Sequence, residues 1–272
     1  LQQRGIDYVL VEKDRICSGV TGNTTAKITI QHGLNYQKIL NYCGEEGARL
    51  YLRANQEAFE QFAELSKNHS ADYERKDNYV YSLTNKTKLE DEIQALRKIG
   101  YSADLCKGLS IPLRTVGAVR FRAQAQFHPL KFLASLAKDL NIYEQTFVRE
   151  MIGTTAVTDY GRIQAKRVIV ATHFPFINKH GCYFLKLYQH RSYVIALENA
   201  PPLNGMYVDE CNTGFSFRNY QGLTFIGGGG HRTGKQGGTW TELKQFAKKN
   251  FPCSKEKYRW ATQDCMSLDS VP

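Results

Sequence analysis

An acid at the end of a short apolar run is the first place where this sequence could do chemistry. Residues 8–11 read Tyr-Val-Leu-Val and lead directly into Glu12. Such a run is typical of a buried parallel strand, because helices cover both faces of a parallel sheet. A carboxylate at the end of the second strand of a dinucleotide fold can accept hydrogen bonds from an adenosine ribose. The small and hydroxyl residues at 18–25 then give a backbone that could pass close to a bulky ligand. A buried strand, a chance acid and a polar loop would produce the same pattern.

The elements that must position these residues follow from hydrophobic periodicity and turn residues. The pattern predicts helices at 36–42, 45–67, 88–99, 130–140 and 241–250. It predicts strands at 79–83, 118–127, 143–148, 155–158, within 164–170, and at 191–197, 215–220 and 223–231. The last of these strands ends in four glycines, which by themselves also suit a flexible loop.

Five ordered segments carry a family resemblance that extends over essentially the whole chain. The first reads EKDR at 12–15 and SGVTGNTTAK at 18–27, and the others lie at 124–129, 168–173, 223–231 and 259–264. Together they resemble the D-amino-acid-oxidase-like FAD-dependent oxidoreductases, most closely the branch often fused to a Rieske iron–sulfur domain. At 173 many members of the family have glycine, whereas this sequence has His173, as that branch does.

The resemblance implies an α/β protein with a discontinuous FAD-binding, Rossmann-like fold and an inserted mixed α+β substrate domain. The FAD-binding domain would comprise residues 1–71, 127–178 and 222–272, and the substrate domain 72–126 and 179–221. The implied reaction moves a hydride from a C–H bond, commonly next to an amine, to flavin N5. Because the flavin carries that chemistry, no catalytic side chain is assigned.

The same resemblance implies the residues of the site. Those expected to contact FAD are Glu12, Lys13, Arg15, Ser18, Thr21, Gly22, Thr24, Thr25, Ala26, Lys27, Val148, Ala171, Thr172, His173, Gly227, Gly228 and Gly229. Those expected to line a substrate pocket facing the flavin are Tyr81, Arg191, Tyr193 and Arg218. The two arginines are included because the family often binds an anionic group of the substrate with an arginine. A solvated surface position remains the alternative for either one.

Composition limits the partners. The formal charge of +10 and the pI near 9.2 favour anionic ligands, such as a dinucleotide or nucleic acid. The basic residues are scattered, so their charge is interpreted as solvated surface and nucleic acid is not the expected partner. A non-catalytic basic module that binds nucleic acid or another anionic partner is the alternative. The sequence contains no run of 18 apolar residues, so no membrane span is expected. Seven cysteines without CxxC spacing argue for reduced thiols and a cytoplasmic protein, with no zinc or Rieske ligands in this sequence.

The remaining expectations concern the partners and the two ends of the sequence. A small molecule would be the substrate, and the electron acceptor would be a Rieske domain or another redox partner. Only residues 1–7 precede the acid-ended run, and no GxGxxG turn is present. The sequence is therefore expected to be a fragment that binds FAD poorly. The runs at 8–11 and 168–170 would then lack a neighbouring strand and leave apolar surface bare.

Overall fold

A nine-stranded mixed sheet forms the centre of the computed structural model, which describes residues 1–177, 181–211 and 214–269. The strands follow the order β14-β10-β13-β12-β11-β3-β5-β2, and β4 also pairs with β5. All neighbours are antiparallel except β11 and β3, which run parallel. In chain order the strands are β2 (Lys27–Ile28), β3 (Glu74–Ser82), β4 (Asp104–Cys106), β5 (Gly117–Gln126), β10 (Leu187–Glu198), β11 (Met206–Asp209), β12 (Ser216–Tyr220), β13 (Leu223–Arg232) and β14 (Lys255–Ser267).

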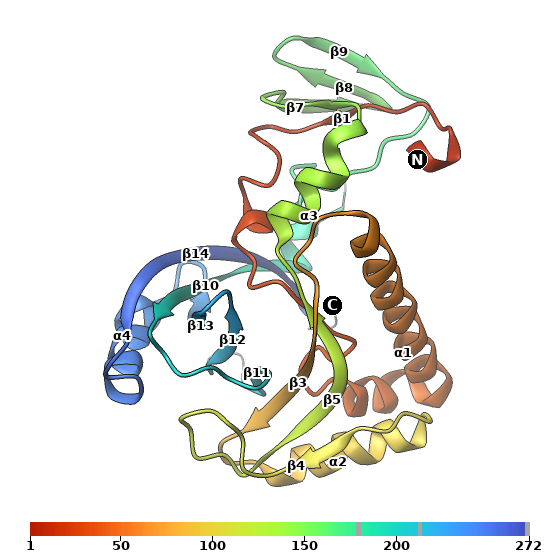
Figure 1. Cartoon of the computed structure of the whole chain (residues 1–272). Helices are drawn as coiled ribbons and strands as arrows, with labels where there is room; N and C mark the ends of the chain where they lie inside the picture. The colour runs from red at the N-terminus through yellow and green to blue at the C-terminus, as the bar shows by residue number, and fades with distance from the viewer. Residues whose placement is uncertain (178–180, 212–213, 270–272) are drawn as a thin grey trace.

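Helices cover this sheet in two places and create two hydrophobic cores (Figure 1). The helices are α1 (Tyr36–Asn68), α2 (Lys86–Lys98), α3 (Pro129–Leu136) and α4 (Thr239–Asn250). The first core lies between α1, α2, α3 and strands β2 and β5, with Tyr36 and Phe121 at its centre. The second lies where α4 packs on β13 and β10, around Phe217 and Leu243.

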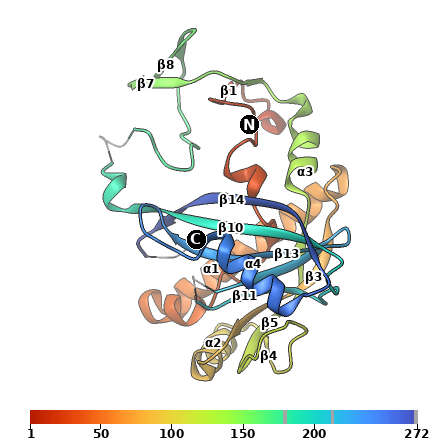
Figure 2. The same ribbon diagram turned by 90° about the vertical axis from the view of Figure 1, so that its left-hand side faces the viewer.

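A smaller part of the chain lies away from the large sheet, at the end of the molecule that carries the N-terminus (Figure 2). It contains a two-stranded parallel sheet, β1 (Leu10–Val11) with β6 (Ile142–Tyr143). A three-stranded antiparallel sheet follows, formed by β7 (Val148–Ile152), β8 (Thr155–Thr158) and β9 (Gly161–Gln164). Single-turn 3₁₀ helices occur at η1 (Gln2–Arg4), η2 (Val20–Asn23), η3 (Ala137–Asp139) and η5 (Tyr183–Leu185).

Most of the expected elements are present, and two differences have clear physical causes. The helices predicted at 36–42 and 45–67 form one helix, α1, with a kink at Gly44, whose φ of 70° is not helical. The strand predicted within 164–170 ends at Gln164, and residues 165–177 have no regular structure. A strand at 168–170 would need a paired neighbour for its backbone groups, and the structure provides none there.

The expectation of bare apolar surface around the first run is confirmed. Val9 and Leu10 are 39% and 40% exposed, so the buried parallel strand predicted at 8–11 is only the short, exposed β1. Ile169 is 75% exposed in the second run. Because β1 pairs with β6 alone, one edge of that strand has no partner among the described residues.

The predicted division into two domains stays a prediction. The large sheet joins strands from both predicted units, since β13 pairs with both β10 and β12, and β14 pairs with β10. Among the described residues no helix is long and apolar enough to cross a membrane.

A buried carboxylate connects the two helices of the first core. Glu92 of α2 is completely buried and accepts hydrogen bonds from the backbone N–H groups of Tyr36 and Gln37, at 2.9 and 2.8 Å. These N–H groups open α1 and have no partner within the helix. Burial raises the pKa of the Glu92 carboxyl to about 7, and the two backbone hydrogen bonds oppose that rise.

Stability should therefore depend on the protonation of Glu92. Its pKa is raised from 4.5 to about 7, so the native state binds the proton more tightly than the unfolded chain does. The stabilising effect of this proton is complete below the unfolded pKa and is lost as pH rises through about 7. We expect the free energy of unfolding to fall by roughly 2–3 kcal/mol over that range. Urea unfolding at about pH 5 and about pH 8 measures it.

Glu92→Gln is the matched variant, because the amide has a similar shape and does not titrate. It should lose one of the two capping interactions at every pH, and the pH-dependent part of the difference should disappear. Equal pH dependence in the two proteins would show that Glu92 keeps an ordinary pKa.

Candidate functional site

The two faces of the sheet differ in chemistry near α4. Phe217 of β12 packs against Phe246 of α4, with ring centroids 5.7 Å apart. Since successive side chains of a strand point to opposite faces, Arg218 points away from α4. Its guanidinium lies over the ring of Phe225 at 4.9 Å, and Phe225 meets Trp260 edge-on at 5.5 Å. We call this side, which carries Arg218, Phe225 and Trp260, the inner face.

The loop at 18–27 lies against the inner face. The indole Nε1 of Trp260 donates to the backbone oxygen of Asn23 at 2.8 Å. Nη1 of Arg218 donates at 3.5 Å to the backbone oxygens of Ala26 and Phe127. The chain then enters β2, where Lys27 pairs with Gln126 of β5. Two segments singled out in the sequence, 18–27 and 124–129, therefore meet at Arg218.

Lys27 and Arg218 place two cations close together in this region. Arg218 is 3% exposed, and burial lowers its pKa to about 10. Burial, and then repulsion by Arg218, lowers the pKa of Lys27 to about 7, although part of that residue still reaches solvent. Neither side chain forms an ion pair with any residue that the structure describes. This pair is the strongest electrostatic feature of the inner face.

A polar row continues along β14 beyond Trp260. Thr262 pairs with Ser192 of β10, and Asp264 pairs with His190. The hydroxyl of Ser192 donates to the Asp264 carboxylate at 3.0 Å, whereas the buried Thr262 hydroxyl has no partner in the described part of the chain. Burial lowers the pKa of His190, and the nearby charge of Asp264 opposes this. A ligand above the inner face would find hydrogen-bonding groups along this row.

The segment at 171–173 lies beside the same strand. The ring Nε2 of His173 accepts a hydrogen bond from the backbone N–H of Cys265 in β14, at 3.0 Å. His173 has a φ of 63°, in the region that glycine adopts most easily. Thr172 donates from its hydroxyl to the backbone oxygen of Phe174 at 3.2 Å, and Ala171 is exposed. The structure thus brings the predicted residues Ala171, Thr172 and His173 next to β14.

Glu12 and Val148 come together in the smaller part of the molecule. Glu12 directly follows β1, and its backbone oxygen accepts from the N–H of Thr146 at 2.8 Å, two residues before Val148. One carboxylate oxygen of Glu12 accepts from the N–H of Asp14 at 2.9 Å. The neighbouring Lys13 forms an exposed ion pair with Asp14 at 3.6 Å. A ligand in contact with both Glu12 and Val148 is compatible with this arrangement.

The rest of the predicted cofactor loop is held largely by contacts within itself. Ser18 donates to the backbone oxygen of Arg15 at 2.8 Å, and Thr21 is exposed. Gly22 has no room for a side chain, because a Cβ there would lie 2.2 Å from the backbone oxygen of Cys17. The hydroxyl of Thr24 accepts from the N–H of Ala26 at 3.1 Å, and that of Thr25 lies 3.5 Å from the Lys27 amine.

The glycines at 227–229, which were expected to contact a cofactor, lie tightly against neighbouring protein atoms. They lie in β13, where a Cβ on Gly227 would approach the hydroxyl of Ser216 to 2.6 Å. A Cβ on Gly228 would meet Phe215 at 2.7 Å, and one on Gly229 would meet the backbone of Thr239 at 2.4 Å. Glycine is required here so that β12 and α4 can pack closely against β13.

The four predicted substrate residues do not line one pocket. Tyr81 and Tyr193 belong to the hydrophobic core under α4, where the Tyr81 hydroxyl donates to the backbone oxygen of Phe215 at 2.7 Å. Arg191 donates to Gln263 at 3.4 Å. Arg218 lies on the opposite face and is buried, so the surface alternative is wrong for it. The alternation of side chains along β10 and β12 separates the residues in this way.

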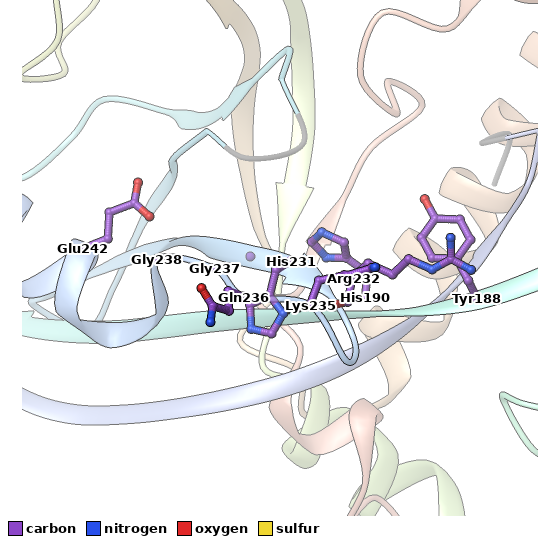
Figure 3. A pocket seen from close by; sticks show the side chains of 10 residues that line it. Tyr188, His190, His231, Arg232, Lys235, Gln236, Gly237, Gly238 and Glu242 are labelled. Carbon is purple, nitrogen blue, oxygen red and sulfur yellow. Dashed lines mark hydrogen bonds between the residues drawn. The ribbon is translucent and has the colours of Figure 1, made fainter.

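A hollow of about 690 Å³ lies where β10 and β13 meet the start of α4 (Figure 3). His190 and His231 line it together with Arg232, whose guanidinium lies over the Tyr188 ring at 4.9 Å. In Figure 3 the side chain of Glu242 lies away from those of His190, His231 and Arg232. Because His231 contacts the hydroxyl of Tyr193 at 3.1 Å, the hollow borders the core under α4.

Four residues of the inner face were not among the predicted site residues. They are Gln126, Trp260, Thr262 and Asp264, all within the segments 124–129 and 259–264 that the resemblance had singled out. The motifs indicated that these segments matter, but not which side chain of each points to the inner face.

Comparisons with known proteins agree on one family. A family model described as "FAD dependent oxidoreductase" (DAO) matches residues 1–272. A protein of Bacillus subtilis (strain 168) named as a Rieske 2Fe-2S iron–sulfur protein, YhfW, is 32% identical over 295 residues. That match covers 100% of this chain and 58% of the relative, so the chain spans less than two thirds of the relative's length.

Two solved structures share the fold. Glycine oxidase from Geobacillus kaustophilus has a TM-score of 0.76 at 16% identity, covering 97% of this chain and 77% of the other. L-proline dehydrogenase from P. horikoshii has a TM-score of 0.75 at 16% identity, covering 99% and 78%.

The residues present fit an FAD molecule in two separate places. Glu12 and the strand that begins at Val148 would flank the adenosine end. The inner face would meet the flavin ring, because the buried hydroxyl of Thr262 has no partner in the described residues. The loop at 18–27 runs from the first place to the second.

Glu12→Gln should weaken FAD binding by about 1–3 kcal/mol, because a charge-assisted hydrogen bond to the ribose would be lost. Titration of a form of the protein that binds FAD measures the dissociation constant. Asp7→Asn is the matched control, since it removes the same charge from an exposed position just before β1. An unchanged dissociation constant in Glu12→Gln would remove Glu12 from the cofactor site.

Proposed function

Because this chain belongs to the FAD-dependent oxidoreductase (DAO) family, we propose that it oxidises a small amine or amino-acid-like molecule by hydride transfer to the flavin. The observation that carries the proposal is the inner face. There Arg218 and Trp260 hold the loop at 18–27 against the sheet, beside buried polar groups that lack partners. The fold shared with a glycine oxidase and an L-proline dehydrogenase supports the choice of substrate class.

The chain's own residues would bind and orient the reactants. When bound, FAD supplies the acceptor of the hydride. Glu12 would hold the ribose, the backbone at 18–27 would follow the dinucleotide, and Trp260 and Thr262 would lie near the ring. The aromatic side chains on the inner face would exclude water from the reacting atoms.

Arg218 would stabilise an anionic group of the substrate. It is a buried cation without a carboxylate partner among the described residues, and its Nε is unpaired. A carboxylate bound near it would neutralise the charge and complete its hydrogen bonding. Tyr81 and Tyr193 would act at most indirectly, through the core that supports the sheet, and Arg191 through its contact with Gln263 of β14.

The reaction would need a redox partner to accept the electrons. The name of the Bacillus subtilis relative points to a Rieske 2Fe-2S centre as that acceptor, and this chain corresponds to 58% of the relative's length.

Arg218→Met should raise KM for an anionic substrate by about tenfold or more in a form that turns over, because a partly dry site loses a paired charge. Arg218→Lys is the matched control that keeps the charge. Thermal unfolding of both variants separates lost binding from lost folding, since Arg218 also holds the loop at Ala26 and Phe127. An unchanged KM in folded Arg218→Met would exclude the proposed contact.

The 272-residue chain by itself should bind FAD weakly. The reason is the exposed apolar run at 168–170 and the single neighbour of β1, which leave the adenosine end of the site without a continuous sheet. Absorbance of the purified chain and titration with FAD measure the occupancy. Tight binding of one FAD per chain would contradict this expectation. Salt-dependent retention on nucleic acid without any flavin would favour the basic binding module instead.

A further inference from the structure

A second hollow, of about 480 Å³, lies between α4, at one edge of the molecule in Figure 1, and the loop that joins β4 to β5. Its apolar lining comes from Pro112 and Leu113 of that loop, from Phe215, and from Phe246 of α4. The ring centroids of Phe215 and Phe246 are 4.3 Å apart, and both rings pack against the core under α4. The core therefore holds an apolar depression open on the side of the sheet opposite to Arg218.

The charged residues around this hollow are almost all basic. Arg114 lies on the loop, and Lys248 and Lys249 lie at the end of α4, all three exposed. None of the three forms an ion pair within the described part of the chain. The loop at 107–116 contains no acid, and α4 contains none after Glu242. Glu242 itself is in the first turn of α4, where the helix dipole favours a carboxylate. The rim therefore carries positive charge that the described chain does not compensate.

Part of this charge has a structural explanation. Lysines in the last turn of a helix interact favourably with the helix dipole, which accounts for Lys248 and Lys249. Arg114 has no such role, because it belongs to a loop, yet it lines the hollow from the wall opposite to α4. The fold thus explains two of the three cations and leaves the arginine unexplained.

An apolar centre inside a charged rim is the common arrangement of a protein interface. We infer that this hollow is the docking site of a protein partner that presents an apolar side chain flanked by acidic residues. The apolar side chain would enter the hollow and cover Phe215 and Phe246. The flanking carboxylates would pair with Arg114 on one wall and with Lys249 on the other.

Two other occupants fit this surface less well. A second copy of the chain would bring like charge to like charge, since the chain has a formal charge of +10. Nucleic acid would pair with the basic rim but has no side chain for the apolar centre. Its bases stack on free aromatic faces, whereas Phe215 and Phe246 pack against each other and against Phe217. Charge complementarity together with the apolar centre therefore favours an acidic protein.

The docking site goes beyond the proposed function, because it lies on the side of the sheet opposite to Arg218 and Trp260. A partner bound there would leave the inner face accessible. Flavin-free protein is therefore sufficient to test the inference.

Two fluorescein-labelled peptides of about a dozen residues are the probes. One has a central phenylalanine among glutamates and aspartates, and the other has serine in place of the phenylalanine. Fluorescence anisotropy in the presence of the 272-residue chain measures both dissociation constants. We expect the phenylalanine peptide to bind at least about tenfold more tightly, because only its ring is buried in the hollow. Raising NaCl from about 50 to about 300 mM should weaken the binding of both peptides several-fold.

Three variants separate charge from apolar contact. Arg114→Glu combined with Lys249→Glu should weaken both peptides by at least about tenfold and keep the preference for phenylalanine. Gln245→Trp places a bulky ring on the hollow side of α4, so it should remove that preference while the charges remain. Lys166→Glu combined with Arg167→Glu is the matched control, because it makes the same change of charge in the loop after β9. All these positions are exposed, so thermal unfolding should match that of the parent.

Equal affinity for the two peptides, or an equal loss of affinity in the control, would overturn the inference, because net charge alone would then explain binding. A DNA duplex of about 20 base pairs that binds more tightly than the phenylalanine peptide would also overturn it. Self-association of the parent that Gln245→Trp abolishes would assign the hollow to a second copy instead. Peptide binding by a chain that never takes up FAD would count against the proposed function alone, and FAD binding without a preference for phenylalanine would count against the docking site alone.

Discussion

The buried guanidinium of Arg218 is the interaction on which the inner face depends. It lies over Phe225 and donates to the backbone oxygens of Ala26 and Phe127, which come from segments about a hundred residues apart in the chain. Burying this charge lowers its pKa to about 10, so the fold bears a cost for keeping it there. Trp260 secures the other side of the same loop through Asn23. Without these two anchors the loop at 18–27 would have few contacts with the sheet.

Around Arg218, the sheet keeps two environments apart. On the α4 side, Tyr81, Tyr193 and Phe217 form a continuous core. On the inner face, charged and hydroxyl groups remain, several of them without partners. An apolar core on one face makes the sheet rigid enough to hold costly polar groups on the other. Function is expected on the face where hydrogen bonding is incomplete, because packing alone gives no reason to retain such groups.

Buried charge has different effects in the first core and on the inner face of the sheet. In the first core, Glu92 is isolated, and its two backbone donors at the start of α1 compensate part of its burial. On the inner face, Lys27 and Arg218 repel each other, and neither forms an ion pair with a described residue. The first arrangement is complete within the chain and reads as structural. The second leaves the buried Nε of Arg218 without a partner among the described residues, which is why we connect it with ligand binding.

The sequence alone determined the family, the order of the elements and the segments that form the site, since short-range periodicity and motif spacing encode these. It predicted helices on either side of Gly44, which the structure joins into the kinked α1, and a helix at 241–250, which the structure begins at Thr239. Only the tertiary structure decided which face each side chain takes, and it moved Tyr81 and Tyr193 into the core and Arg218 into a buried pair with Lys27. It also showed that Gly227 and Gly228 make room for protein side chains, and that 168–170 forms no strand. Strand pairing and burial depend on residues far apart in the chain, and no local pattern contains that information.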